Sequence, residues 1–229
     1  MKNIIINDKV CKATEGKTVL EVARENGIDI PTLCYLKECG NVGKCGVCAV
    51  EIEGKNNLAL ACLTKVEDGM VVRTDTEKVQ ERVKARVSTI LNKHEFKCGP
   101  CPRRENCELL KLVIKTKAKA TTPFVVENKE EYVDVRSKSI TIDRSKCILC
   151  GRCAAACTEK TGTSSIKLVN VNGKRIVTPE EQKCFDETNC LLCGQCVAAC
   201  PVGALSEKTH IDRVKEALED PEKQDRKSV

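Results

Sequence analysis

Cysteine makes up 18 of the 229 residues, and most of these cysteines fall into four groups with the spacing of metal ligands. The strongest pattern is a pair of C-x2-C-x2-C-x3-C runs, which is the bacterial spacing for [4Fe–4S] clusters. In paired runs of this kind, the first three thiolates bind one cluster and the fourth thiolate binds the other. The spacing therefore predicts two ligand sets, named here the Cys147 set (Cys147, Cys150, Cys153 and Cys200) and the Cys190 set (Cys190, Cys193, Cys196 and Cys157).

Glycine and proline beside these runs also fit cluster-binding loops. Gly151 and Gly194 allow a tight turn that aims backbone N–H groups at sulfur. Pro201 follows Cys200, as this motif expects, whereas Thr158 stands at the matching position of the first run. Structural zinc sites favour cysteine pairs separated by a dozen or more residues, so the triplets favour iron–sulfur clusters over zinc.

A third group has the spacing Cys34-x10-Cys45-x2-Cys48-x13-Cys62, which suits a [2Fe–2S] cluster in a loop with one distant ligand. The spacing differs from the plant-type C-x4-C-x2-C pattern. Cys39 lies in the same loop and is the alternative first ligand, but it would leave an x5 gap that matches no established motif. We therefore predict the Cys34 set (Cys34, Cys45, Cys48 and Cys62).

The fourth group, the His94 set, has the spacing His94-x3-Cys98-x2-Cys101-x5-Cys107. Steps of four and three residues place side chains on one side of a turn. On spacing alone, a Cys3His zinc site and a [4Fe–4S] cluster fit equally well, and the three other iron–sulfur patterns favour the cluster. A neutral imidazole removes one negative charge, which should raise the reduction potential, as histidine does in Rieske centres.

Composition argues against several other classes of protein. With Phe 3, Tyr 2 and Trp 0, the chain has few side chains for one large aromatic core, and small domains often use metal instead. No apolar run reaches about 18 residues, which predicts no transmembrane helix. The first residues do not resemble a signal peptide, which predicts a cytoplasmic protein whose clustered cysteines bind metal rather than form disulfides.

The net charge of +6 suggests nucleic-acid binding only while the thiols are counted as neutral. Metal-bound thiols are deprotonated, and four clusters with their ligands would bring the net charge to about −1. The basic excess therefore offsets the negative charge of the chain's own sites, and no nucleic-acid partner is expected.

The elements that must position these groups fall into two halves. In the first, strands are expected at 2–6, 9–14, 49–53 and 70–74, with a helix from a Thr18–Glu21 capping box to Asn26. This order predicts a compact α+β domain. In the second half, the expected elements are helices at 77–93 and 108–114, a hairpin at Asn172-Gly173, a helix capped by Thr209 and Asp212 that ends at Pro221, and a polar tail at 222–229.

The order of the four groups resembles the N-terminal accessory-cluster module of [FeFe]-hydrogenases and the matching region of NAD-dependent formate dehydrogenase large subunits. The first half is also similar to the large iron–sulfur subunit of respiratory complex I. The segments that carry the resemblance are CYLKECGNVGKCGVC with Cys62, HEFKCGPCPRRENCEL, CILCGRCAAAC and ETNCLLCGQCVAACPVGAL. The resemblance implies a β-grasp [2Fe–2S] domain (1–76), a helical His/Cys3 [4Fe–4S] segment (77–118), a connector (119–139), a two-[4Fe–4S] ferredoxin domain (140–207), and a C-terminal helix and tail (208–229).

We expect no catalytic site in this sequence, because it has neither a nucleotide-binding glycine loop nor a nucleophile with its base. The expected function is that of an electron-transfer subunit with one [2Fe–2S] and three [4Fe–4S] clusters. The resemblance implies a flavoprotein partner that binds FMN or FAD and NAD(P)H, with ferredoxin as a further redox couple, in an electron-bifurcating complex. The alternative is the accessory-cluster subunit of a split [FeFe]-hydrogenase or formate dehydrogenase. A redox-responsive DNA-binding protein is disfavoured, because no helix-turn-helix is evident.

Overall fold

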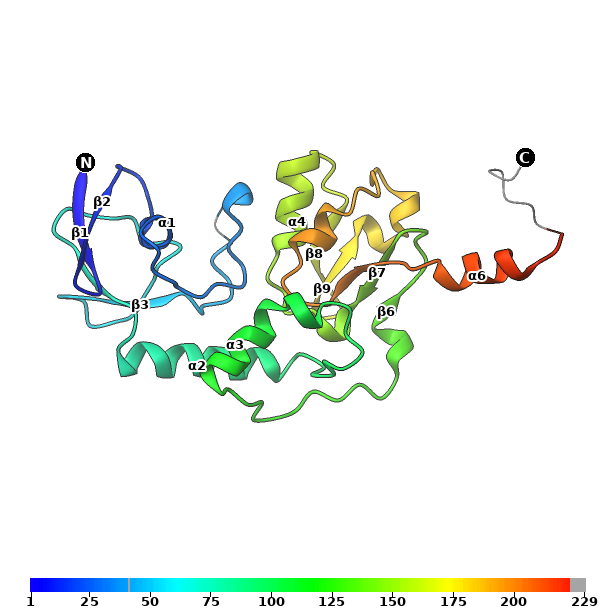
Figure 1. The fold of residues 1–229 in the computed structure, drawn as a ribbon, viewed down its shortest axis with the longest axis horizontal. Helices are drawn as coiled ribbons and strands as arrows, with labels where there is room; N and C mark the ends of the chain where they lie inside the picture. The colour runs from blue at the N-terminus through cyan, green and yellow to red at the C-terminus, as the bar shows by residue number, and fades with distance from the viewer. Residues whose placement is uncertain (41, 223–229) are drawn as a thin grey trace.

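The computed structural model describes residues 1–40 and 42–222. Figure 1 shows an N-terminal sheet at one end of the long axis, a pair of helices beside it, and a C-terminal unit with the remaining strands. These parts follow one another in chain order, so each predicted ligand group is positioned by different elements.

The N-terminal unit is a five-stranded sheet in the order β2-β1-β5-β3-β4. Strands β1 and β5 are parallel, and the other neighbours are antiparallel. Alternate residues of β1, Ile4 and Ile6, are fully buried, as the period of a half-buried strand requires. The predicted capping box between Thr18 and Glu21 is confirmed. The elements are β1 (Lys2–Ile6), β2 (Lys9–Ala13), α1 (Val19–Glu25), β3 (Ala49–Ile52), β4 (Ala59–Leu60) and β5 (Val71–Arg73).

Two helices, α2 (Glu77–Leu91) and α3 (Glu108–Thr116), join the two units. Helix α2 contacts both β3 and α3, and the two helices lie side by side in Figure 1. The predicted apolar stripe of α2 is confirmed. Its buried members are Val79, Val83, Val87 and Leu91.

The C-terminal unit contains a small antiparallel sheet in the order β10-β7-β6, a separate β8–β9 hairpin and two short helices. Asn172 and Gly173 both have positive φ values, 48° and 75°, at the turn of the predicted hairpin. The backbone therefore follows the right-handed twist of the strands, and the hairpin prediction is confirmed. The elements are β6 (Val133–Asp134), β7 (Ile140–Asp143), α4 (Arg152–Ala156), β8 (Ile166–Val171), β9 (Lys174–Pro179), α5 (Gln195–Ala199) and β10 (Leu205–Glu207).

The last helix, α6 (Ile211–Glu219), differs from its predicted start. Its N-cap residue is His210, which makes no side-chain capping bond. The Thr209 hydroxyl accepts a hydrogen bond from the Ile211 N–H at 3.3 Å, so Thr209 forms a local turn. The predicted capping box between Thr209 and Asp212 is therefore wrong. The predicted tail lies, from residue 223 onward, outside the described residues.

Candidate metal centres

Strand β4, which the sequence did not predict, pairs with β3 and brings two members of the Cys34 set together. Ala49 of β3 lies opposite Leu60 of β4. The cysteines that flank this pair, Cys48 and Cys62, therefore meet at an Sγ–Sγ distance of 3.3 Å. A strand of two residues shows no hydrophobic period, so β4 has no local sequence signal that could have been read.

Cys34, rather than Cys39, lies with the other thiols of its set. The Cys34 sulfur accepts hydrogen bonds from the backbone N–H groups of Lys44 at 3.3 Å and Cys45 at 3.4 Å. Cys39 is partly exposed on the 3-10 turn Lys37–Cys39. Burial raises the pKa of its thiol, and the charge of Lys160 in the C-terminal unit opposes this shift. This placement favours Cys34 as the first member of the set.

Hydrogen bonds divide the Cys34 set into two pairs. The Cys45 thiol donates to Cys34 and lowers the pKa of Cys34, while its own pKa is raised. The Cys48 and Cys62 thiols also share a hydrogen bond, which lowers the pKa of Cys48 and raises that of Cys62. Metal binding requires four thiolates, so loading this set must release the shared protons.

The four members of the His94 set line one small cavity. Nδ1 of His94 lies 2.9 Å from the Lys146 carbonyl oxygen. Because a carbonyl oxygen can only accept, Nδ1 carries the proton and the lone pair is left on Nε2. Burial also lowers the pKa of His94, so the ring is neutral. A neutral imidazole whose other nitrogen is fixed by a carbonyl is the usual form of a histidine ligand.

Gly203 closes this cavity from the C-terminal unit. A Cβ atom at Gly203 would lie 2.5 Å from the Cys101 sulfur, which is far inside van der Waals contact. Only glycine therefore leaves room for the thiol in this position. The two residues are about a hundred positions apart in the sequence, so spacing alone could not reveal the contact.

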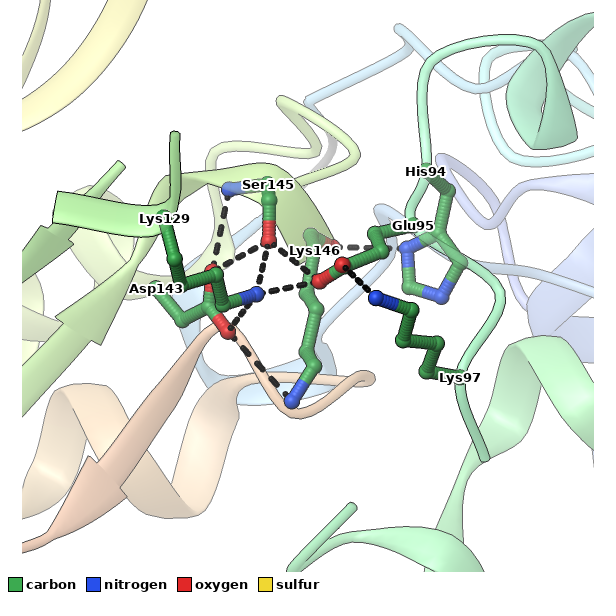
Figure 2. A network of polar contacts seen from close by, with 7 residues as sticks. All are labelled: His94, Glu95, Lys97, Lys129, Asp143, Ser145 and Lys146. Atoms are coloured by element: carbon green, nitrogen blue, oxygen red, sulfur yellow. Dashed lines mark hydrogen bonds and ion pairs between the residues drawn. The ribbon is translucent and has the colours of Figure 1, made fainter. Parts of the chain in front are cut away.

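A network of buried carboxylates and more exposed lysines holds the backbone beside the histidine (Figure 2). The Glu95 carboxylate, 3% exposed, pairs with Lys129, which also lies 3.0 Å from Asp143. The Ser145 hydroxyl contacts both carboxylates and can donate its one proton to either. The Glu95 N–H donates to the Ser145 carbonyl at 2.9 Å. These contacts join the His94 set to the segment just before the Cys147 set.

The two remaining sets each line a cavity of their own. The Cys147 set lines one small cavity, and the Cys190 set lines another. Each cavity is therefore lined by three cysteines of one run and by the fourth cysteine of the other run.

Two short helices, α4 and α5, end at Cys157 and Cys200, the fourth cysteines of the two runs. Helix α4 starts after Gly151 (φ 83°) and helix α5 after Gly194 (φ 73°), a backbone region that favours glycine. The two helices pack together. Cys157 ends α4 in helical conformation, whereas Cys200 is extended, as a residue before proline must be. Thr158, which replaces that proline, therefore lets the first run continue as a π-helix.

Hydrogen bonds from backbone N–H groups to cysteine sulfur recur in both runs. The sequence predicts such turns at Gly151 and Gly194 but not at the two leucines that donate here. The backbone N–H of Leu149 donates to the Cys147 sulfur, and that of Leu192 donates to the Cys190 sulfur, both at 3.4 Å. Both leucines have positive φ values, 55° and 52°, which are uncommon for residues other than glycine. Strained backbone of this kind is typical of functional loops.

The two cysteines outside the motif loops have ordinary packing roles. Cys11 is 1% exposed in the core of the N-terminal sheet. Cys184 is also buried, and its thiol donates to an Asp186 carboxylate oxygen at 3.2 Å. Neither sulfur lines the cavities described above.

The donor chemistry of these sets fits iron–sulfur groups. The donors are cysteine sulfurs and one imidazole, and backbone N–H groups donate to several of the sulfurs.

Three family models match successive parts of the chain. Residues 2–77 match a 2Fe-2S iron-sulfur cluster binding domain, and residues 146–204 match a 4Fe-4S dicluster domain. Between them, residues 78–118 match an iron hydrogenase 1-like, iron-sulfur centre-binding domain.

Relatives cover nearly the whole chain. The gamma subunit of the NAD-reducing hydrogenase HoxS from Cupriavidus necator is 30% identical over 90% of this chain and 86% of its own length. This chain belongs to the same iron–sulfur family. Iron hydrogenase 1 of Clostridium pasteurianum is 58% identical over 97% of this chain, and NADP-reducing hydrogenase subunit HndD of Solidesulfovibrio fructosivorans is 37% identical over the same share.

The family includes subunits of NAD(P)-reducing hydrogenases and of NADH-quinone oxidoreductases, and the matched domain models describe iron–sulfur binding. The chain spans 39% of the length of iron hydrogenase 1 and of HndD. A chain in a crystal structure of NAD+-reducing [NiFe]-hydrogenase in the H2-reduced state has the same fold. Its TM-score is 0.82 at 24% identity, over 91% of this chain and 88% of that chain. In the described part of the chain, no helix is long and apolar enough to cross a membrane.

Proposed function

We propose that this chain relays single electrons between a flavoprotein that binds FMN or FAD and NAD(P)H and a second redox partner, such as ferredoxin. The exchange of fourth cysteines between the Cys147 and Cys190 sets carries the proposal, because it places two ligand sets against one packed pair of helices. One apolar core also contains thiols of the Cys34 set and of both these sets. Continuity of this kind is what a relay requires.

Iron–sulfur clusters bound at the four sets would each accept and release one electron. The chain's own residues supply the conditions for that chemistry. Buried apolar side chains exclude water, and the Leu149 and Leu192 N–H groups donate to ligand sulfurs. The Thr163 hydroxyl lies 3.2 Å from the Cys157 sulfur. Donors directed at sulfur stabilise added negative charge and raise the reduction potential.

Metal content tests the proposed number of clusters, one [2Fe–2S] and three [4Fe–4S]. Protein purified without oxygen should contain about 14 irons and as many acid-labile sulfides per chain. EPR spectra during stepwise reduction should resolve one [2Fe–2S] signal from the others. About 10 irons with one zinc per chain would instead assign zinc to the His94 set.

The partner is tested by purifying the native assembly under anaerobic conditions. The names of HndD and HoxS, NADP-reducing and NAD-reducing hydrogenases, favour a nicotinamide-linked flavoprotein. We expect about one flavin-binding subunit for each copy of this chain, and NAD(P)H should reduce the clusters through it. We further propose that the assembly is electron-bifurcating, so one NAD(P)H should reduce two different acceptors by one electron each. Clusters that stay oxidised with NAD(P)H would contradict the flavoprotein partner.

A second candidate is the accessory-cluster part of an [FeFe]-hydrogenase, favoured by the 58% identity to iron hydrogenase 1. In that case the same relay delivers electrons to a hydrogen-forming site. The native assembly should then produce hydrogen from reduced methyl viologen. An assembly with flavin but no hydrogen production supports the first candidate.

A further inference from the structure

Arg152 is a buried cation between two of the predicted ligand sets. It is the first residue of α4, lies next to Cys153, and is 5% exposed. Helix α4 contacts the turn Lys37–Cys39 in the loop of the Cys34 set. At Gly151, the residue before Arg152, a Cβ atom would lie 3.2 Å from Val42 and 3.7 Å from the Lys44 Nζ atom of the same loop. Arg152 therefore lies beside the Cys147 set on its own segment and beside the loop of the Cys34 set across the contact.

The guanidinium is held in place by one carboxylate. Its two terminal nitrogens donate to the two Glu108 oxygens at 2.6 and 2.8 Å, a bidentate pair. Glu108 begins α3, so the pair joins α3 to α4. An arginine guanidinium stays protonated in proteins, so Arg152 is a cation paired with the Glu108 carboxylate.

One donor of this side chain is left over. The Arg152 Nε atom is buried and has no hydrogen-bond partner among the described residues. A buried unpaired donor is costly unless a group outside the polypeptide accepts its proton. Sulfur of an iron–sulfur group is such an acceptor.

We propose that Arg152 sets the reduction potentials of the groups held by the Cys34 set and the Cys147 set. This inference rests on the proposed function, because it requires clusters at both sets. Each cluster gains one negative charge when it accepts an electron. A buried cation stabilises that state, and the Glu108 carboxylate partly cancels the effect. Arg152 therefore couples the two centres, because the same cation stabilises an added electron at either set.

Two substitutions with opposite charge effects test this role. R152Q removes the cation, and E108Q leaves the cation without its counter-charge. R152Q should lower the equilibrium constant for reduction of both clusters by at least tenfold, which is 59 mV for one electron. E108Q should raise the reduction potential of both clusters. R152K keeps the charge and should restore the wild-type potentials.

The measurement is a potentiometric titration of the intact protein, followed by EPR, with iron content checked for every variant. R73Q is the matched control, because Arg73 forms an exposed ion pair with Asp8 at 2.5 Å. Opposite shifts larger than that of R73Q support the proposal. Shifts of the same sign, or no shift, overturn it, because a purely structural role cannot give opposite signs. If R152Q does not fold, a rise in E108Q supports the proposal and its absence overturns it.

Failure of this inference is distinguishable from failure of the proposed function. Wild-type protein without iron would contradict the function itself. Wild-type protein with its full iron content, but with potentials that ignore Arg152 and Glu108, would contradict only the role of Arg152.

Discussion

His94 differs from every other predicted ligand because its ring is neutral. The Lys146 carbonyl fixes the proton on Nδ1, and burial keeps the second nitrogen unprotonated. A thiolate in the same place would add one negative charge to the centre. Its ligand type therefore sets this predicted centre apart from the Cys147 set and the Cys190 set.

Replacing His94 by cysteine tests this charge effect. We expect H94C to keep its cluster and to lower the potential of that centre by on the order of 100 mV, because a thiolate disfavours the added electron. EPR-monitored redox titration measures the shift. His210 is exposed and lines no centre, so H210A serves as the control. A potential that rises in H94C would contradict the assignment of His94.

At the scale of elements, buried charges join the segment after α2 to the segment after β7. Although burial alone would raise the pKa of Glu95, contacts with Lys129, Lys97 and Ser145 lower it to about 2. The ordinary value is 4.5. A carboxyl group with a lowered pKa stabilises the folded state above its unfolded value, and this stabilisation is lost as the pH falls towards the folded value.

The variant E95Q should therefore be less stable at neutral pH and lose acid sensitivity. We expect a loss on the order of 2 kcal/mol at pH 7, or a Tm lower by about 5 °C. The difference from wild type should stay constant down to about pH 5 and narrow below pH 4.5. Circular dichroism of anaerobic samples measures both Tm values. The control variant E130Q removes an exposed carboxylate and should show no such difference from wild type.

The loop before β10 makes a second contact between elements, at Gly203 and Cys101. G203A should displace the Cys101 thiol, because the added methyl group would lie 2.5 Å from its sulfur. We expect the loss of about 4 irons, with the other centres retained. Iron analysis and EPR detect this loss. G99A is the matched control, because a Cβ there meets no atom within 4 Å. Full iron content in G203A would show that the thiol can move aside.

At the scale of the whole molecule, the ligand sets lie in the part of the chain before α6. Helix α6 buries none of its residues, and Ile211, Val214 and Leu218 are all exposed. His210, just before the helix, donates from Nε2 to the Lys138 carbonyl at 3.0 Å. His210 therefore makes a contact with the C-terminal unit, whereas α6 buries no residue against it.

A chain that ends at His210 should keep every cluster. We expect its iron content and EPR spectrum to equal those of the longer chain, and its Tm to change by no more than about 2 °C. Loss of iron from the shortened chain would show that α6 supports a centre. The comparison needs only anaerobic iron analysis and thermal unfolding of the two proteins.

The sequence by itself determined the ligand sets that we predict and several local elements. Cysteines two or three residues apart are confined to one loop, so their spacing already limits the group they can bind. The α2 stripe and the Asn172-Gly173 turn were also readable, because helical period and turn geometry are local properties.

Only the tertiary structure showed how distant segments meet at each set and which residues outside the sets lie against them. Strand β4 brings Cys62 to Cys48, Gly203 makes room for Cys101, and the helix that begins with Arg152 contacts the loop of the Cys34 set. Each contact joins residues from separate segments, and its energy comes from packing and charge across space. Such contacts leave no period in the chain, so they follow from the folded arrangement and not from sequence spacing.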